Sequence, residues 1–183
     1  MTADRVARAE AVLGFIGGVL RAAGSFAPTL IGSDEARTLL YITVDVCLTA
    51  GLMSIYLPRR HRMNAVGAIG FFLALAGLVA GRTSPAITKL DLYPVTAAAV
   101  AIGVLALTLA EWRSKRMTGW IPVVFGLSFA LGSMGTVIAG AGALFIVSGI
   151  LFGCAFAAMA VQPIAGRAAA DDDRAESALK PEA

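Results

Sequence analysis

Two charged residues lie inside apolar stretches of the sequence, and they carry the most specific chemistry of the chain. Arg21 lies within the stretch 11–31, and Asp45 lies within the stretch 38–57. An ionised side chain inside a bilayer costs at least ~2.5–3.5 kcal/mol on insertion scales, so it usually faces the interior and finds a partner. We therefore predict that Arg21 and Asp45 form a buried pair. Such a pair either locks two helices together or forms a polar site for a substrate or a proton; a third alternative is a snorkelling Arg21 beside a protonated Asp45.

Three polar side chains accompany the predicted pair. Ser25 shares a helix face with Arg21, whereas Tyr41 and Thr49 lie on or near the side of the next helix that carries Asp45. Both charged residues lie roughly eight positions from the loop that joins their stretches, which is about 12 Å at the helical rise per residue. Because the depths agree, contact is favoured, and Ser25, Tyr41 and Thr49 are candidates for the lining of a polar site.

The distribution of charge indicates what kind of protein positions these residues. No Asp, Glu, Lys or Arg occurs between Arg116 and Arg167, whereas one bilayer crossing needs only ~20 apolar residues. In the whole chain 58% of residues are hydrophobic and 15% are charged, against about a quarter charged in a soluble domain. A soluble fold would have to bury the uncharged stretch without a polar face. The sequence therefore predicts an all-α integral membrane protein, with the bundle in residues 1–165.

Six apolar segments have the length that a bilayer crossing requires. A helix satisfies its own backbone in lipid, and these segments lack the two-residue alternation of barrel strands. Short connections make sequential neighbours antiparallel, which predicts three helical hairpins. The predicted transmembrane helices are 11–31, 38–57, 64–81, 92–111, 119–137 and 142–162.

Positive charges in the loops predict the orientation, because Lys and Arg gather on the cytoplasmic side of a membrane. One set of ends and loops carries eight of them and the alternate set carries three. Both ends of the chain are therefore expected in the cytoplasm, as in a multi-pass protein of the cell inner membrane. An alternative for 11–31 is a cleaved signal peptide behind basic residues, but Glu10 and Pro28 argue against it. The eight charges are Arg5, Arg8, Arg59, Arg60, Arg62, Arg113, Lys115 and Arg116.

Small residues recur on single helix faces. Gly67, Gly70 and Gly77 form a stripe on the third segment, and Gly149 and Gly153 form a shorter one on the sixth. Lipid supplies no hydrophobic force between helices, so close van der Waals contact must hold a bundle together, and small residues permit it. We predict that these glycines are helix-packing positions. The alternative is that they line a narrow pore.

The composition changes from Gly166 onward, where apolar residues other than alanine become rare and an aspartate run appears. A segment of this kind cannot bury a core. Residues 166–183 are therefore predicted to form a disordered cytoplasmic tail. The alternative is an acidic tail that binds a partner.

Catalytic and cofactor chemistry has little support in the sequence. One histidine and two cysteines offer no metal-ligand cluster, and no catalytic or nucleotide-binding motif is present, so we expect no enzyme activity, metal or cofactor. Nucleic acid is not expected as a partner, because no basic face carries interleaved aromatic residues. The expected role is structural or accessory, with the lipid bilayer and either a membrane protein or a second copy as partners. The alternative is a transporter of a small solute, ion or proton that uses Arg21 and Asp45; a membrane-embedded enzyme ranks third.

Overall fold

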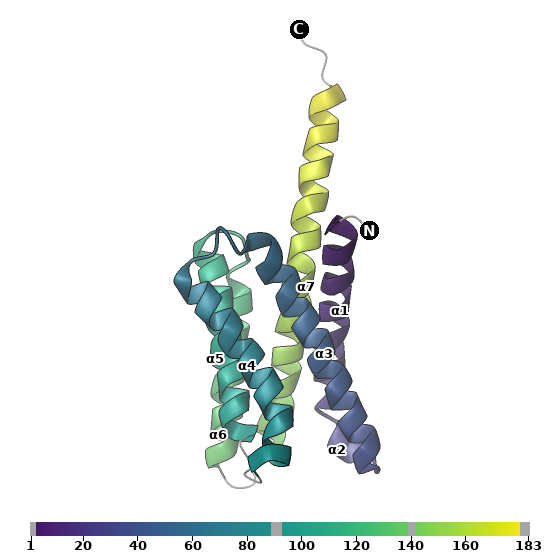
Figure 1. Cartoon of the computed structure of the whole chain (residues 1–183), viewed down its shortest axis with the longest axis vertical. Helices are drawn as coiled ribbons and strands as arrows, with labels where there is room; N and C mark the ends of the chain where they lie inside the picture. The colour runs from purple at the N-terminus through teal and green to yellow at the C-terminus, as the bar shows by residue number, and fades with distance from the viewer. Residues whose placement is uncertain (1–2, 89–92, 139–141, 180–183) are drawn as a thin grey trace.

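The structure is a computed structural model that describes residues 3–88, 93–138 and 142–179. Seven helices and no strand occur within these ranges, so the all-α prediction is confirmed. The helices are α1 (Ala3–Gly24), α2 (Ala27–Leu30), α3 (Asp34–Arg59), α4 (Ala65–Thr88), α5 (Tyr93–Arg113), α6 (Trp120–Val137) and α7 (Gly142–Leu179) (Figure 1).

Four helices are long and apolar enough to cross a membrane. These candidate spans are Asp34–Arg59, Pro94–Arg113, Trp120–Val137 and Gly142–Gln162, and Ala65–Gly81 forms a shorter apolar helix. Lys89, one of the three positive charges in the alternate set of loops, lies outside the described residues. The chain therefore has the helix lengths and compositions of a membrane protein.

The first predicted segment is broken, which differs from the continuous helix expected over 11–31. Helix α1 ends at Gly24, and α2 starts at Ala27. Pro28 has no backbone N–H to donate to the carbonyl of Gly24, and its ring would clash with that carbonyl, so α1 does not continue through it. Proline is tolerated in the first turn of a helix, which is its place in α2. Between the two helices, the backbone N–H groups of Ser25 and Phe26 donate hydrogen bonds to the carbonyls three residues earlier, those of Ala22 and Ala23.

Side-chain caps mark the starts of two helices, and one of these helices begins before the apolar core that predicted it. Ser33 precedes α3, and its hydroxyl accepts a hydrogen bond of 3.1 Å from the backbone N–H of Ala36. Asn64 does the same for α4, because its side-chain oxygen accepts from the N–H of Gly67 at 2.9 Å. Each cap satisfies a backbone donor that the first helical turn leaves without a partner. This is why α3 starts before residue 38.

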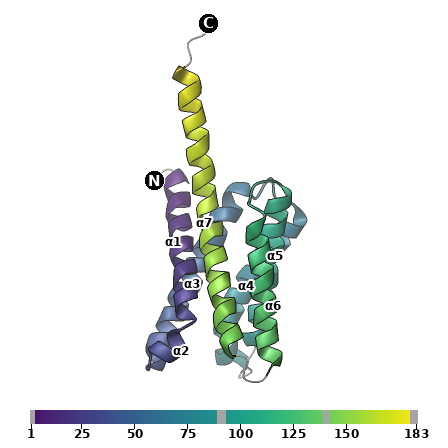
Figure 2. The same cartoon turned by 180° about the vertical axis from the view of Figure 1, so that it is seen from behind.

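The helices form a bundle in which the N-terminal helix contacts the C-terminal one. Helix α1 packs against both α3 and α7, α4 packs against α5, and α6 packs against α7. Both chain ends lie at the same end of the bundle as the α3–α4 and α5–α6 connections (Figures 1 and 2). The last turns of α4 and α6 and the first turns of α5 and α7 lie at the opposite end (Figures 1 and 2).

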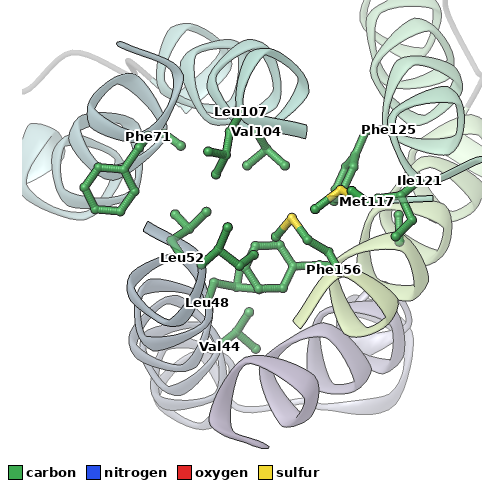
Figure 3. Packing of buried hydrophobic residues seen from close by; sticks show 14 residues of the cluster. Val44, Leu48, Leu52, Phe71, Val104, Leu107, Met117, Ile121, Phe125 and Phe156 are labelled. Atoms are coloured by element: carbon green, nitrogen blue, oxygen red, sulfur yellow. The ribbon is translucent and has the colours of Figure 1, made fainter. Parts of the chain in front are cut away.

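An apolar cluster fills the middle of the bundle. Side chains from several helices point toward one another there, and the largest fully buried ones are Phe71 and Phe156 (Figure 3). Tyr56 of α3 stacks on Phe71 of α4, with ring centroids 4.0 Å apart. The labelled side chains of the cluster are Val44, Leu48, Leu52, Phe71, Val104, Leu107, Met117, Ile121, Phe125 and Phe156.

The first part of the predicted tail belongs to a helix in the structure, and disorder of the tail stays a prediction. Helix α7 continues past Gly166 to Leu179 and extends beyond the bundle (Figures 1 and 2). The local reason is composition, because alanine has the highest helix propensity and this segment is rich in alanine. Residues 180–183 of the predicted tail lie outside the described residues.

Candidate functional site

Helix α1 carries Arg21 along an antiparallel contact with α3. A Cβ atom added to Gly14 would lie 2.5 Å from the Cα of Gly51, so the two backbones touch there. Further along, one added to Gly24 would lie 3.6 Å from the ring of Tyr41. Because the two helices are antiparallel, residue numbers increase along α1 in the direction in which they decrease along α3. Arg21 therefore lies level with the turn of α3 that follows Tyr41. That turn contains Asp45.

A second contact, with α7, lies on the adjacent face of α1. A Cβ added to Gly18 would lie 2.6 Å from the carbonyl oxygen of Gly153, which leaves no room for a side chain. Ser25 and Arg21 approach the same helix one or two turns away. A Cβ added to Gly149 would overlap the Ser25 hydroxyl and lie 3.7 Å from Nη1 of Arg21. The guanidinium of Arg21 therefore reaches α7.

These two contacts place Arg21 in the groove where α1, α3 and α7 meet. At 100° per residue, its position on α1 falls between the face that meets α3 and the face that meets α7. Arg21 and Asp45 are both half-buried, and they lie at the same depth on neighbouring helices. The ion pair between them stays a prediction.

Two of the three predicted lining residues, Ser25 and Tyr41, lie at the same groove. Ser25 donates a hydrogen bond of 3.2 Å to the carbonyl of Arg21. The Tyr41 hydroxyl crosses from α3 to α1 and donates to the carbonyl of Gly24 at 3.2 Å. Thr49 is half-buried one turn beyond Asp45. The groove thus holds the Arg21 guanidinium with the hydroxyls of Ser25 and Tyr41 nearby. That Asp45 and Thr49 also line it stays a prediction.

The glycines predicted to pack helices lie against neighbouring backbones. A Cβ added to Gly70 would lie 2.7 Å from the carbonyl oxygen of Gly103 on α5, and one added to Gly77 would lie 2.8 Å from that of Thr96. One added to Gly67 would lie 3.1 Å from the Cβ of Ala110. All three glycines therefore face α5 along its length.

A second ionic site, at the end of the bundle that holds both chain ends, is one that sequence reasoning undervalued. Glu111 of α5 is only 1% exposed, and its Oε2 lies 2.6 Å from Nη1 of Arg59 at the end of α3. Its Oε1 lies 3.9 Å from Nη1 of Arg116. In the sequence, Glu111 is simply a charge next to the basic residues Arg113, Lys115 and Arg116. The available signal was its spacing, because it follows the buried Leu107 by one helical turn.

Hydroxyl groups buried elsewhere in the bundle bond to the backbone. Ser128 of α6 and Ser148 of α7 exchange hydrogen bonds, each hydroxyl donating to the other's carbonyl at 2.9 and 2.8 Å. Ser54 donates to the carbonyl of Gly51, and Thr108 donates to that of Val104. These groups therefore stabilise helices and helix pairs rather than facing an open polar path.

Comparisons with known proteins add no relative. No protein-family model, curated protein or solved structure matches this chain. Among the described residues, no three His, Cys, Asp or Glu side chains gather in a group suited to a metal ion. The function is therefore argued from the groove around Arg21, the Glu111 site and the packing of the bundle.

Proposed function

We propose that the chain is a multi-pass protein of the cell inner membrane with six spans and a structural or accessory role. It acts through contacts with a membrane protein or with a second copy of itself. Four apolar helices of spanning length support the membrane placement. Both ends of the chain lie with the two most basic loops (Figure 1), which supports a cytoplasmic location for that end.

The two further spans in this proposal are α1 and α4. Helix α1 contacts α3 and α7 from Gly14 to Ser25, and the residues that it meets belong to candidate spans on both helices. Helix α4 meets the candidate span of α5 from Gly67 to Gly77 in the same way. A helix packed along a spanning helix lies in the same layer. Helix α1 packs against α3, α4 against α5, and α6 against α7. These three pairs support the three-hairpin arrangement.

The filled interior is the observation that carries the accessory role. Leu52, Leu107 and Phe156 are fully buried among other apolar side chains between the helices. The buried hydroxyls bond to backbone carbonyls. A transporter needs polar groups that exchange partners with a substrate, and the interior described here uses them to hold helices.

Cross-linking in cells tests the accessory role. Phe71 and Phe72 are a matched neighbouring pair, because Phe71 is 2% exposed and Phe72 is 56% exposed. A photo-cross-linking amino acid in place of Phe72, or at exposed positions on other helices, is expected to give a discrete protein adduct. The same residue at Phe71 should give none. Lipid adducts alone at every exposed helix face would contradict the accessory role.

A transporter remains the second candidate, favoured by Arg21 in a three-helix groove and by Asp45 at the same level on α3. Vesicles that contain purified protein and a pH-sensitive dye distinguish the two roles. The accessory role predicts the same proton and ion leakage in vesicles with wild-type protein, with Asp45→Asn protein and without protein. Leakage that requires wild-type Asp45 in folded protein would favour the transporter.

A further inference from the structure

The α3–α4 and α5–α6 connections are fastened together by the buried Glu111 carboxylate. Arg59 reaches it from the last turn of α3, where the first connection begins, and Arg116 reaches it from the second connection. Arg116 also donates a hydrogen bond of 3.5 Å to the carbonyl of Arg62. Two loops that are distant in sequence thereby form one surface with fixed relative positions.

Four cationic side chains remain on the outside of this surface. Glu111 is engaged by Arg59 and Arg116, and it is the one carboxylate between residues 46 and 90 or between 92 and 170. The exposed cations are Arg60, Arg62, Arg113 and Lys115, which we call the basic face. In the part of the chain that the structure describes, none of these four forms an ion pair. The face therefore carries a concentrated, uncompensated positive charge.

Lys115 holds its place on the basic face at a conformational cost. It lies two residues beyond the end of α5 and has a φ of 56°, in the left-handed region that glycine usually occupies after a helix end. Its N–H donates to the carbonyl of Trp112 at 2.8 Å, and the next N–H donates to the carbonyl of Glu111 at 3.0 Å. Glycine would make the same turn without strain. A cation at this position is therefore better explained by its charge than by the fold.

Tryptophans place the basic face at the level of lipid headgroups. Trp112 and Trp120 are exposed at the same end of α5 and α6, and tryptophan side chains concentrate at the membrane–water interface. Lys115 follows Trp112 by three positions. The cations are thus held at the depth where phosphate groups of lipids lie.

We propose that the basic face binds the headgroup phosphate of an acidic phospholipid. Arginine guanidinium groups donate paired hydrogen bonds to phosphate oxygens, and Lys115 adds a point charge. The Glu111 link holds the two loops in position before the lipid arrives, so less ordering is needed on binding. This inference rests on the proposed membrane placement with this end in the cytoplasm.

Lys115→Gly is the sharpest test, because it removes the charge and also removes the strain. Purified protein in neutral detergent is titrated with phosphatidylglycerol, with phosphatidylcholine, or with inorganic phosphate, and bound lipid is counted by native mass spectrometry. We expect wild-type protein to prefer phosphatidylglycerol. Lys115→Gly should unfold at the same or a higher temperature and bind phosphatidylglycerol about fivefold more weakly.

Arg8→Gln is the matched control, because Arg8 is also an exposed cation at this end of the bundle but lies on α1. It should bind phosphatidylglycerol as the wild type does. Equal loss in Arg8→Gln would show general charge attraction and overturn the site, as would equal binding of the two lipids. Inorganic phosphate that displaces the lipid at millimolar concentration would assign the face to free anions and also overturn the proposal. Extraction of the protein from membranes by alkaline carbonate would instead contradict the membrane placement itself.

Discussion

Arg59 and Glu111 are 52 positions apart in the sequence, and Nη1 of the arginine lies 2.6 Å from Oε2 of the carboxylate. The contact joins the end of α3 to the end of α5, although these helices are not neighbours in sequence. Glu111 is buried while Arg59 is partly accessible. The carboxylate therefore depends on its arginine partners for the interactions that water would otherwise supply.

We predict that Glu111→Gln lowers the stability of the bundle, because it leaves Arg59 beside a neutral group in a buried site. The expected loss is about 3 kcal/mol, as for other buried pairs that lose one partner. Thermal unfolding in detergent measures it. The exposed pair of Asp34 and Arg37 supplies the control, since Asp34→Asn should change little. A double Arg59→Gln, Glu111→Gln variant should recover part of the loss, and no recovery would mean that the two side chains are not coupled.

The contact between α1 and α7 should not tolerate one added methyl group. A Cβ on residue 18 would lie 2.5 Å from the backbone nitrogen of Ala157, so Gly18→Ala must push the helices apart and lower the unfolding temperature. Gly126→Ala is the control, because the nearest atom would be 4.0 Å away, on Leu105. That change should be neutral or stabilising, since alanine favours helix. Equal unfolding temperatures for the two variants would argue against the close crossing.

The Arg21–Asp45 pair predicts a specific pattern of folded yields. Arg21→Ala or Asp45→Ala strands one charge in the groove, so each should reduce the yield of monodisperse protein. The double variant should recover part of that yield. Size-exclusion chromatography in detergent provides the measurement. If the double variant is as poor as the sum of the single ones, the two side chains act separately.

Reporter fusions test the proposed orientation. A reporter at His61 or Ser114 should be active on the cytoplasmic side, because both lie in the basic loops. A reporter at Ser33, which precedes α3, should be active outside. The opposite result at His61 would reverse the orientation and would also remove the basic face from the cytoplasmic leaflet.

Apolar runs were sufficient to predict the long helices, because few structures other than a helix can hydrogen-bond every backbone group in lipid. They were insufficient for the side chains that decide the interior. Phe71 and Phe72 are adjacent and chemically identical, but only Phe71 stacks on Tyr56 and is buried. That difference depends on the rotation of α4 against α3. No local pattern encodes this rotation, because both faces of α4 are apolar.

For the candidate sites, too, some features followed from the sequence and others required the structure. The depth of Arg21 and Asp45 followed from counting residues along two helices, since a helix has a fixed rise. The closeness of Arg21 to α7 could not be predicted in this way, because loop lengths show only which helices adjacent in sequence pack together. Glu111 was undervalued for a related reason. The sequence places it beside one basic loop, whereas its burial involves arginines from two separate parts of the chain, Arg59 and Arg116.

The crossing of Gly18 with Gly153 has a consequence for biosynthesis. Helix α1 leaves the ribosome more than a hundred residues before α7 does, so one of its faces lacks its partner during most of translation. Until α7 arrives, lipid or an insertion factor must cover the backbone groove at Gly18 and the side of Arg21 that faces Gly149. A truncated or stalled chain therefore displays a feature that the finished protein hides. Quality-control proteases could use this feature to tell incomplete molecules from complete ones.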